Sequence, residues 1–97
     1  LIRLFLERHR IMVQEIEAAI KQADGVALER AAHSLKGTAG NLCAPEVVLL
    51  ASQLEANGRL GTLAEARTLF AQLEHTVQQL IVVLERQITP ADPTEPR

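Results

Sequence analysis

Apolar residues recur at helical spacing in four segments, with short turn-forming stretches between them. The first segment runs from Leu1 to about Gln22, and the apolar positions of its body lie three or four residues apart: Met12, Ile16, Ala19 and Ile20. This spacing is typical of one face of an α-helix. The start of the segment, LIRLFL, is apolar on nearly every side. It fits either a separate short N-terminal helix laid across the others or a stub of linker from a preceding domain.

The second segment begins at Asp24, a residue type that favours the N-cap of a helix. We expect this helix to run from about Gly25 to Leu42. On a helical wheel with about 100° per residue, one side is apolar and predicts the core stripe: Leu28, Ala31, Leu35, Ala39 and Leu42.

The third and fourth segments follow the same pattern. Pro45 suits the first turn of a third helix, which we expect to end near Asn57-Gly58. The fourth segment carries an apolar stripe whose steps alternate between three and four: Leu63, Ala66, Phe70, Leu73, Val77, Leu80, Leu84 and Ile88. Such a stripe is typical of a bundle helix.

These segments predict an all-α fold, an antiparallel four-helix bundle over residues 1–88, because long helices joined by short connections pack against their neighbours in opposite directions. No stretch shows the alternation of a strand. From Thr89 the composition turns to proline and charge, which predicts a disordered C-terminal tail over 89–97.

Composition excludes several classes of function. The chain of 97 residues is long enough for one domain. Its net charge of −2 provides no basic surface for nucleic acid. No apolar run approaches the roughly 18 residues of a membrane span, so we expect no direct membrane contact. The single cysteine, Cys43, excludes an internal disulfide. Because the chain begins with leucine rather than methionine, we expect it to be a domain of a longer protein.

The stretch AAHSLKGTAGN places two glycines inside the second predicted helix. On the helical wheel His33 lies at the middle of the outward face, with Gly37 and Gly40 along the helix from it. The other residues within about 60° of His33 are Val26, Glu29, Arg30, Lys36 and Ala44. Each glycine inside a helix costs roughly 1 kcal/mol relative to alanine. Missing side chains beside an exposed imidazole would clear a shallow surface for a large partner.

The residues around the glycines indicate a chemistry. A neutral imidazole is a nitrogen nucleophile near physiological pH, since the ordinary histidine pKa is about 6.5. Lys36, three positions after His33, places a positive charge on the same face. That charge suits an anion carried by the imidazole, and a phosphoryl group is the obvious one.

The motif AHSLKGTAGNLCA resembles the signature of histidine-containing phosphotransfer (HPt) domains, and so do the surrounding stretches FLE, AAIKQAD and ASQLE. The similarity extends from about Phe5 to Leu84. It implies a four-helix bundle in which His33 is the phosphoacceptor, Lys36 steadies the phosphoryl oxygens and Gly37 leaves room for a receiver domain. It also implies that Glu55 is able to touch and orient the imidazole. The family usually has glycine where this chain has Cys43, so we expect a different turn at that helix end.

The resemblance further implies a phosphorelay carrier in two-component signal transduction. His33 would accept a phosphoryl group from a receiver-domain aspartate and pass it to the aspartate of a response regulator. The receiver would supply magnesium; we expect the domain itself to hold no cofactor, to bind no ATP and not to be an enzyme on its own. The candidate docking residues are Glu29, Arg30, Gly37 and Gly40. We expect a monomeric C-terminal module of a hybrid sensor histidine kinase, located in the cytoplasm and tethered to the bacterial inner membrane through that kinase.

Two alternatives compete with this interpretation. A metal site could combine His33 with His9, His75 and Cys43. However, no two of these residues have the spacing of metal ligands, such as H-x-x-x-H or C-x-x-C. We therefore expect no metal, and we interpret His9 and His75 as surface or seam residues. The second alternative is a purely structural or dimerisation bundle, for which Val82 and Val83 would add apolar surface on the fourth helix.

Overall fold

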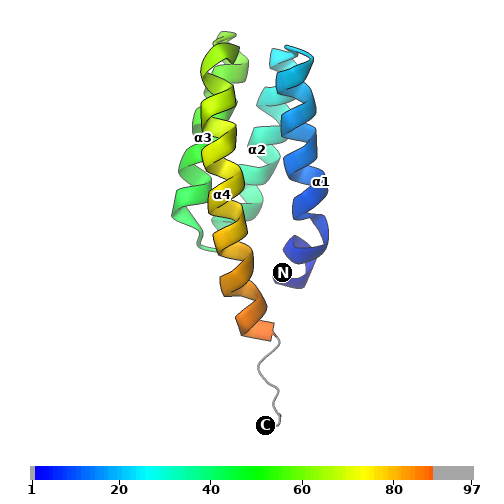
Figure 1. The fold of residues 1–97 in the computed structure, drawn as a ribbon, viewed down its shortest axis with the longest axis vertical. Helices are drawn as coiled ribbons and strands as arrows, with labels where there is room; N and C mark the ends of the chain where they lie inside the picture. Colours follow the sequence, from blue (N-terminus) through cyan, green and yellow to red (C-terminus); the bar gives the residue numbers. More distant parts are fainter. Residues whose placement is uncertain (1, 89–97) are drawn as a thin grey trace.

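The computed structural model describes residues 2–88. Within them the chain forms four helices, α1 (Ile2–Lys21), α2 (Gly25–Asn41), α3 (Pro45–Leu60) and α4 (Leu63–Ile88). The helices run side by side along the long axis, with successive helices antiparallel (Figure 1). The predicted all-α four-helix bundle is confirmed. The predicted tail over 89–97 lies outside the described residues, and the boundary at residue 88 stays a prediction.

The start of α1 differs from the expectation of a separate short helix or linker stub. Ile2–Lys21 is one continuous helix, with Phe5 buried in the core. Ile2 and Leu6 pack against the core at its edge, while Leu4 points outward and is largely exposed. The apolar residues on several sides of this segment therefore reflect one face in the core and another on the surface.

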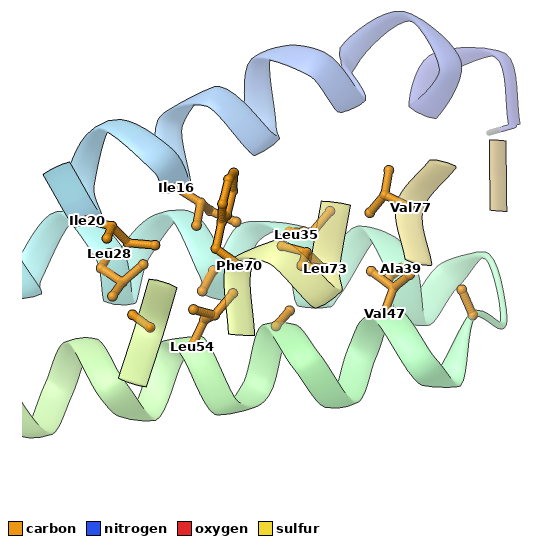
Figure 2. Close-up of a cluster of buried hydrophobic side chains, with 14 of the residues drawn as sticks. Ile16, Ile20, Leu28, Leu35, Ala39, Val47, Leu54, Phe70, Leu73 and Val77 are labelled. Atoms are coloured by element: carbon orange, nitrogen blue, oxygen red, sulfur yellow. The ribbon is translucent and has the colours of Figure 1, made fainter. Parts of the chain in front are cut away.

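The core lies along the axis of the bundle, where side chains from all four helices meet (Figure 2). Most of the predicted stripe residues are buried, among them Ile16, Leu35, Phe70 and Leu73. The predicted stripes of α2 and α4 omitted Ala32 and Ile81, which are also buried. Because α2 packs against both α1 and α3, and α4 against both α3 and α1, each buried face is wider than a single stripe. Ala31 and Leu80 are partly buried at the edges of these faces.

Helices α2 and α3 form the most extensive pair in the bundle. The helices approach so closely at one end that a Cβ on Gly58 would lie 2.6 Å from the backbone nitrogen of Glu29 and 2.6 Å from the carbonyl oxygen of Gly25. The predicted end of α3 near Asn57-Gly58 is two residues early, because Gly58 serves this contact inside the helix. The helix continues to Leu60 and ends at Gly61, whose φ of 77° is left-handed.

The ends of α1 and α2 use the same left-handed turn without glycine. At the end of α2, Cys43 has a φ of 56°, and the amides of Cys43 and Ala44 donate to the carbonyls of Gly40 (3.1 Å) and Ala39 (3.0 Å). This pair of bonds is the Schellman motif. The expectation of a different turn at Cys43 is therefore wrong. At the end of α1, Ala23 has a φ of 53° and the same bonding pattern.

Two further sequence expectations concern the ends of α2. The Asp24 side chain accepts a hydrogen bond from the Ala27 amide at 3.1 Å, which confirms the predicted N-cap. Ala44, in contrast, does not share the outward face of His33. It follows the turn at Cys43, precedes α3 and is buried, because the helix stops at Asn41 before the wheel reaches it.

Candidate functional site

The site is built on α2 and α3, where one carboxylate contacts two residues of the glycine-containing helix. His33 and Lys36 lie one turn apart on α2, and Glu55 lies opposite them on α3. The Nδ1 atom of His33 is 2.8 Å from Oε2 of Glu55, and Nζ of Lys36 is 2.6 Å from Oε1 of the same carboxylate. Two helices therefore hold three polar side chains in one hydrogen-bonded cluster.

The three side chains differ sharply in exposure. The side chain of His33 is 68% exposed, that of Lys36 is 32% exposed and that of Glu55 only 14%. The carboxylate thus lies beneath the imidazole, against the bundle, and the imidazole extends into solvent. Of the two contacts, the one with Lys36 is therefore the more protected from solvent, because both of its partners are partly covered.

The charge state of Glu55 follows from these contacts. The hydrogen bond from Lys36 is the main cause that lowers the pKa of Glu55 below its ordinary value, and the hydrogen bond with His33 lowers it further. Partial burial acts in the opposite direction but does not reverse the shift. Glu55 is therefore ionised at neutral pH and can only accept hydrogen bonds.

This carboxylate determines which imidazole nitrogen is free. An ionised acceptor at 2.8 Å from Nδ1 requires that the proton of a neutral His33 ring lie on Nδ1. The other nitrogen, Nε2, then carries the lone pair. Since the ring is 68% exposed, this lone pair is accessible to a reacting group from solvent or from a partner.

The two glycines beside His33 face open space. A Cβ atom added at Gly37 or at Gly40 would meet no atom within 4 Å. Neither glycine is therefore required by packing within residues 2–88, and both stand in a regular α-helix without a positive φ. The predicted clear surface beside the imidazole is present.

The charged docking candidates lie on the N-terminal half of α2. Glu29 forms an ion pair with Arg59 of α3, with 3.8 Å between Oε2 and Nη1, whereas Arg30 is exposed to solvent. The pair is also largely exposed, so its contribution to stability is small. Glu29 and Arg59 thus form part of the surface that continues from the site toward one end of the bundle.

A groove between α1 and α2 borders the site and was not predicted. Apolar and polar side chains of α1 line one wall, and the other wall includes Ser34, the residue after His33, and Thr38. Two apolar side chains of the groove, Leu4 and Ile11, are each 53% exposed. The unusually apolar start of the chain was the signal that could have identified Leu4.

The remaining histidines and the cysteine lie elsewhere. The ring of His9 packs at 5.7 Å from that of Phe5 on α1. Burial is the main cause that lowers the pKa of His9, the charge of Arg10 lowers it further, and that of Glu85 acts against them. His75 lies on α4 and Cys43 follows α2. Within residues 2–88, no group of three or more histidine, cysteine, aspartate or glutamate side chains is arranged to hold a metal ion.

Comparison with known protein families gives the family of the chain. The model of the Hpt domain family matches residues 1–82, most of the chain. The chain belongs to the Hpt domain family. This result confirms the resemblance found in the sequence. Searches of curated proteins and of solved structures returned no match.

Membership of this family defines the general function. Hpt domains are histidine phosphotransfer carriers of phosphorelays, act in two-component signalling and interact with the receiver domains of response regulators. They are carriers rather than enzymes that bind ATP. Separately, among residues 2–88 no helix is both long and apolar enough to cross a membrane.

Proposed function

We propose that His33 is the phosphoacceptor of this Hpt domain, which takes a phosphoryl group from a receiver-domain aspartate and passes it to the aspartate of a response regulator. The observation that carries the proposal is the hydrogen bond from His33 Nδ1 to Glu55, which leaves an exposed Nε2 beside two glycines. Neither His9 nor His75 combines an exposed ring with such a carboxylate partner within the described residues.

The proposed reaction is an in-line displacement at phosphorus. The Nε2 lone pair of His33 attacks the acyl phosphate of the donor receiver, the N–P bond forms, and the P–O bond to the donor aspartate breaks. Lys36 offers its ammonium to the phosphoryl oxygens from one turn along α2. The receiver supplies the magnesium ion, and this domain contributes no cofactor of its own. Transfer onward reverses the same displacement on a second aspartate.

The proposed docking surface surrounds the imidazole. Gly37 and Gly40 leave space for the receiver on the C-terminal side of His33, and the groove next to Ser34 offers it the exposed apolar side chains of Leu4 and Ile11. Glu29 and Arg30 contribute charges on the N-terminal side. Because Ser34 of the groove directly follows His33 on α2, one docked domain could contact both the groove and the cleared face beside the imidazole.

We further propose the setting of the domain. It acts as a monomer, because the face that carries His33 has to remain free for receivers. It forms the C-terminal module of a hybrid sensor histidine kinase, lies in the cytoplasm and is tethered through that kinase to the bacterial inner membrane. It does not bind nucleic acid, in keeping with its net charge of −2.

A transfer assay tests the proposal. A receiver domain carrying radiolabelled phosphate is mixed with the chain, with His33→Gln and with His75→Gln, the last a matched control on exposed α4 surface. We expect acid-labile, alkali-stable label on the wild type and on His75→Gln, and loss of at least 99% of the label on His33→Gln, since an amide provides no nucleophilic nitrogen. Circular dichroism checks that all three remain folded. Equal labelling of His33→Gln and the wild type would refute the assignment.

A further inference from the structure

Glu55 contacts both residues that the proposed reaction uses, the nucleophile His33 and the cation Lys36. Its Oε2 accepts from Nδ1 of His33 at 2.8 Å, and its Oε1 accepts from Nζ of Lys36 at 2.6 Å. The carboxylate side chain is only 14% exposed, and it contacts Nδ1 from below the exposed imidazole. Nδ1 faces Glu55 and does not react, but its proton affects how easily the phosphoryl group leaves Nε2.

The consequence follows from counting protons and bonds. When Nε2 of the neutral ring attacks phosphorus, the N–P bond forms, the P–O bond to the donor breaks, and the ring keeps its Nδ1 proton and becomes positively charged. In the second transfer the N–P bond breaks, and its electron pair returns to Nε2. A ring that still carries the Nδ1 proton leaves as neutral imidazole, whereas a ring that has lost this proton has to leave as the far more basic imidazolate anion. The Nδ1 proton therefore governs how easily the phosphoryl group departs.

We propose that Glu55 is a positioning residue that keeps the proton on Nδ1 of phosphorylated His33 and thereby keeps the phosphoryl group transferable. The inference rests on the proposed function in one respect, that His33 carries the phosphoryl group on Nε2. An ionised carboxylate favours the protonated ring because it only accepts hydrogen bonds. No proton has to enter or leave the site in either half of the relay.

Lys36 moderates this effect through the same carboxylate. Its ammonium has three donor hydrogens, so one contacts Oε1 while another faces the phosphoryl oxygens. Through Oε1 it withdraws negative charge from Glu55 and weakens the hold of Oε2 on the Nδ1 proton. Lys36 and Glu55 therefore act in opposite directions on the phosphorylated ring. Substitutions of the two residues should therefore shift the pH profile of phosphate loss in opposite directions. A purely structural role of either residue would not produce this result.

The test phosphorylates the chain chemically, without a receiver. The 97-residue chain is treated with phosphoramidate, and the loss of phosphate from His33 is followed from acid to alkaline pH for the wild type, Glu55→Gln and Lys36→Gln. His33→Gln reports any label on His9 or His75, which is subtracted. Thermal melting followed by circular dichroism verifies that each variant is folded.

We expect Glu55→Gln to shift the pH profile of phosphate loss by about one pH unit toward acid, so that loss at neutral to alkaline pH is about ten-fold slower. The glutamine amide is neutral, and its NH₂ is able to donate to an unprotonated Nδ1, which favours the ring that leaves poorly. At acid pH the rates of the two proteins converge, because both rings are protonated. Lys36→Gln shifts the profile in the other direction and speeds the loss.

Three results would overturn the inference: superimposable profiles for the wild type and Glu55→Gln, an equal change for both variants at every pH, or no phosphorylation of His33 by phosphoramidate. The inference and the proposed function fail separately. Wild-type transfer from a receiver combined with an unshifted Glu55→Gln profile refutes only the role of Glu55. A shifted profile without any transfer from receivers refutes only the relay function.

Discussion

Helices α2 and α3 contain two pairs of glycines that use the missing side chain in opposite ways. Gly25 and Gly58 stand where the two backbones touch, and a Cβ on either would lie 2.6 Å from a backbone atom of the other helix. Gly37 and Gly40 stand about three to four turns further along α2, where an added Cβ would meet nothing within 4 Å. One pair faces the interior of the helix pair, and the other faces solvent.

The two pairs differ in what offsets their effect on helix stability. At Gly58 the penalty of about 1 kcal/mol for a glycine inside a helix is offset within the domain by the close packing of α3 on the first residue of α2, Gly25. At Gly37 and Gly40 nothing among residues 2–88 offsets it. The open space at the second pair is what the proposed docking of a receiver beside His33 requires.

The largest expected effect comes from filling the packed pair. Gly58→Ala should destabilise the domain by about 1–3 kcal/mol, because a Cβ at 2.6 Å from the Glu29 nitrogen and the Gly25 oxygen forces the two helices apart. Chemical denaturation followed by circular dichroism measures the change. Gly40→Ala is the matched control, the same substitution in open space, and should be neutral or stabilising.

Equal stability changes for Gly58→Ala and Gly40→Ala would contradict the comparison. The packed pair also affects the site, since Glu55 lies less than one turn before Gly58 on α3. We therefore expect Gly58→Ala to slow transfer to His33 through the displacement of Glu55, even under conditions where the variant is fully folded.

The second effect comes from filling the open pair. Gly37→Ala should stabilise the domain by about 0.5–1 kcal/mol, because alanine is the better helix former and meets no neighbour. Gly37→Gln should also fold, but its longer side chain should slow transfer from a receiver at least ten-fold while leaving chemical phosphorylation by phosphoramidate unchanged. Comparing the two phosphoryl donors separates a docking defect from a defect in the imidazole.

The matched control for Gly37→Gln is Ala71→Gln, a substitution by the same residue at an exposed position of α4. Ala71→Gln should change neither transfer from a receiver nor phosphorylation by phosphoramidate. Receiver transfer to Gly37→Gln at the wild-type rate would mean that the open glycines do not serve docking.

Helical periodicity was sufficient to predict the part of the site that lies on one helix. The angle between residues on α2 follows from their separation in the chain, so the exposure of His33 and the place of Gly37 beside it could be read from the sequence. The position of Glu55 came from the family resemblance alone. Its two hydrogen bonds depend on the distance and rotation of α3 relative to α2, and no periodic pattern encodes these quantities.

The failures of sequence-based prediction have the same origin. Gly58 resembled a helix stop because a glycine that permits close packing and one that ends a helix look alike until the neighbouring helix is known. Ala32 was missed because α2 is covered on two sides. The turn at Ala23 had no signal, since neither glycine nor asparagine marks its left-handed backbone.

The smallest expected effect concerns the positions where glycine is absent although the backbone favours it. Cys43 adopts a φ of 56° at the end of α2, a conformation that costs a residue with a Cβ roughly 1–2 kcal/mol. Cys43→Gly should relieve this strain, and the greater freedom of glycine in the unfolded chain should cancel part of the gain, which leaves a net stabilisation of about 0.5 kcal/mol. Ala23→Gly, at a φ of 53° after α1, is the matched substitution and should change stability in the same direction. Thermal melting of both variants measures the effect, and destabilisation of both would show that the side chains contribute more by their contacts than their backbone strain costs. Transfer to His33 should stay at the wild-type rate in Cys43→Gly. Cys43 follows the end of α2 and lies well over two helical turns beyond His33 along the chain.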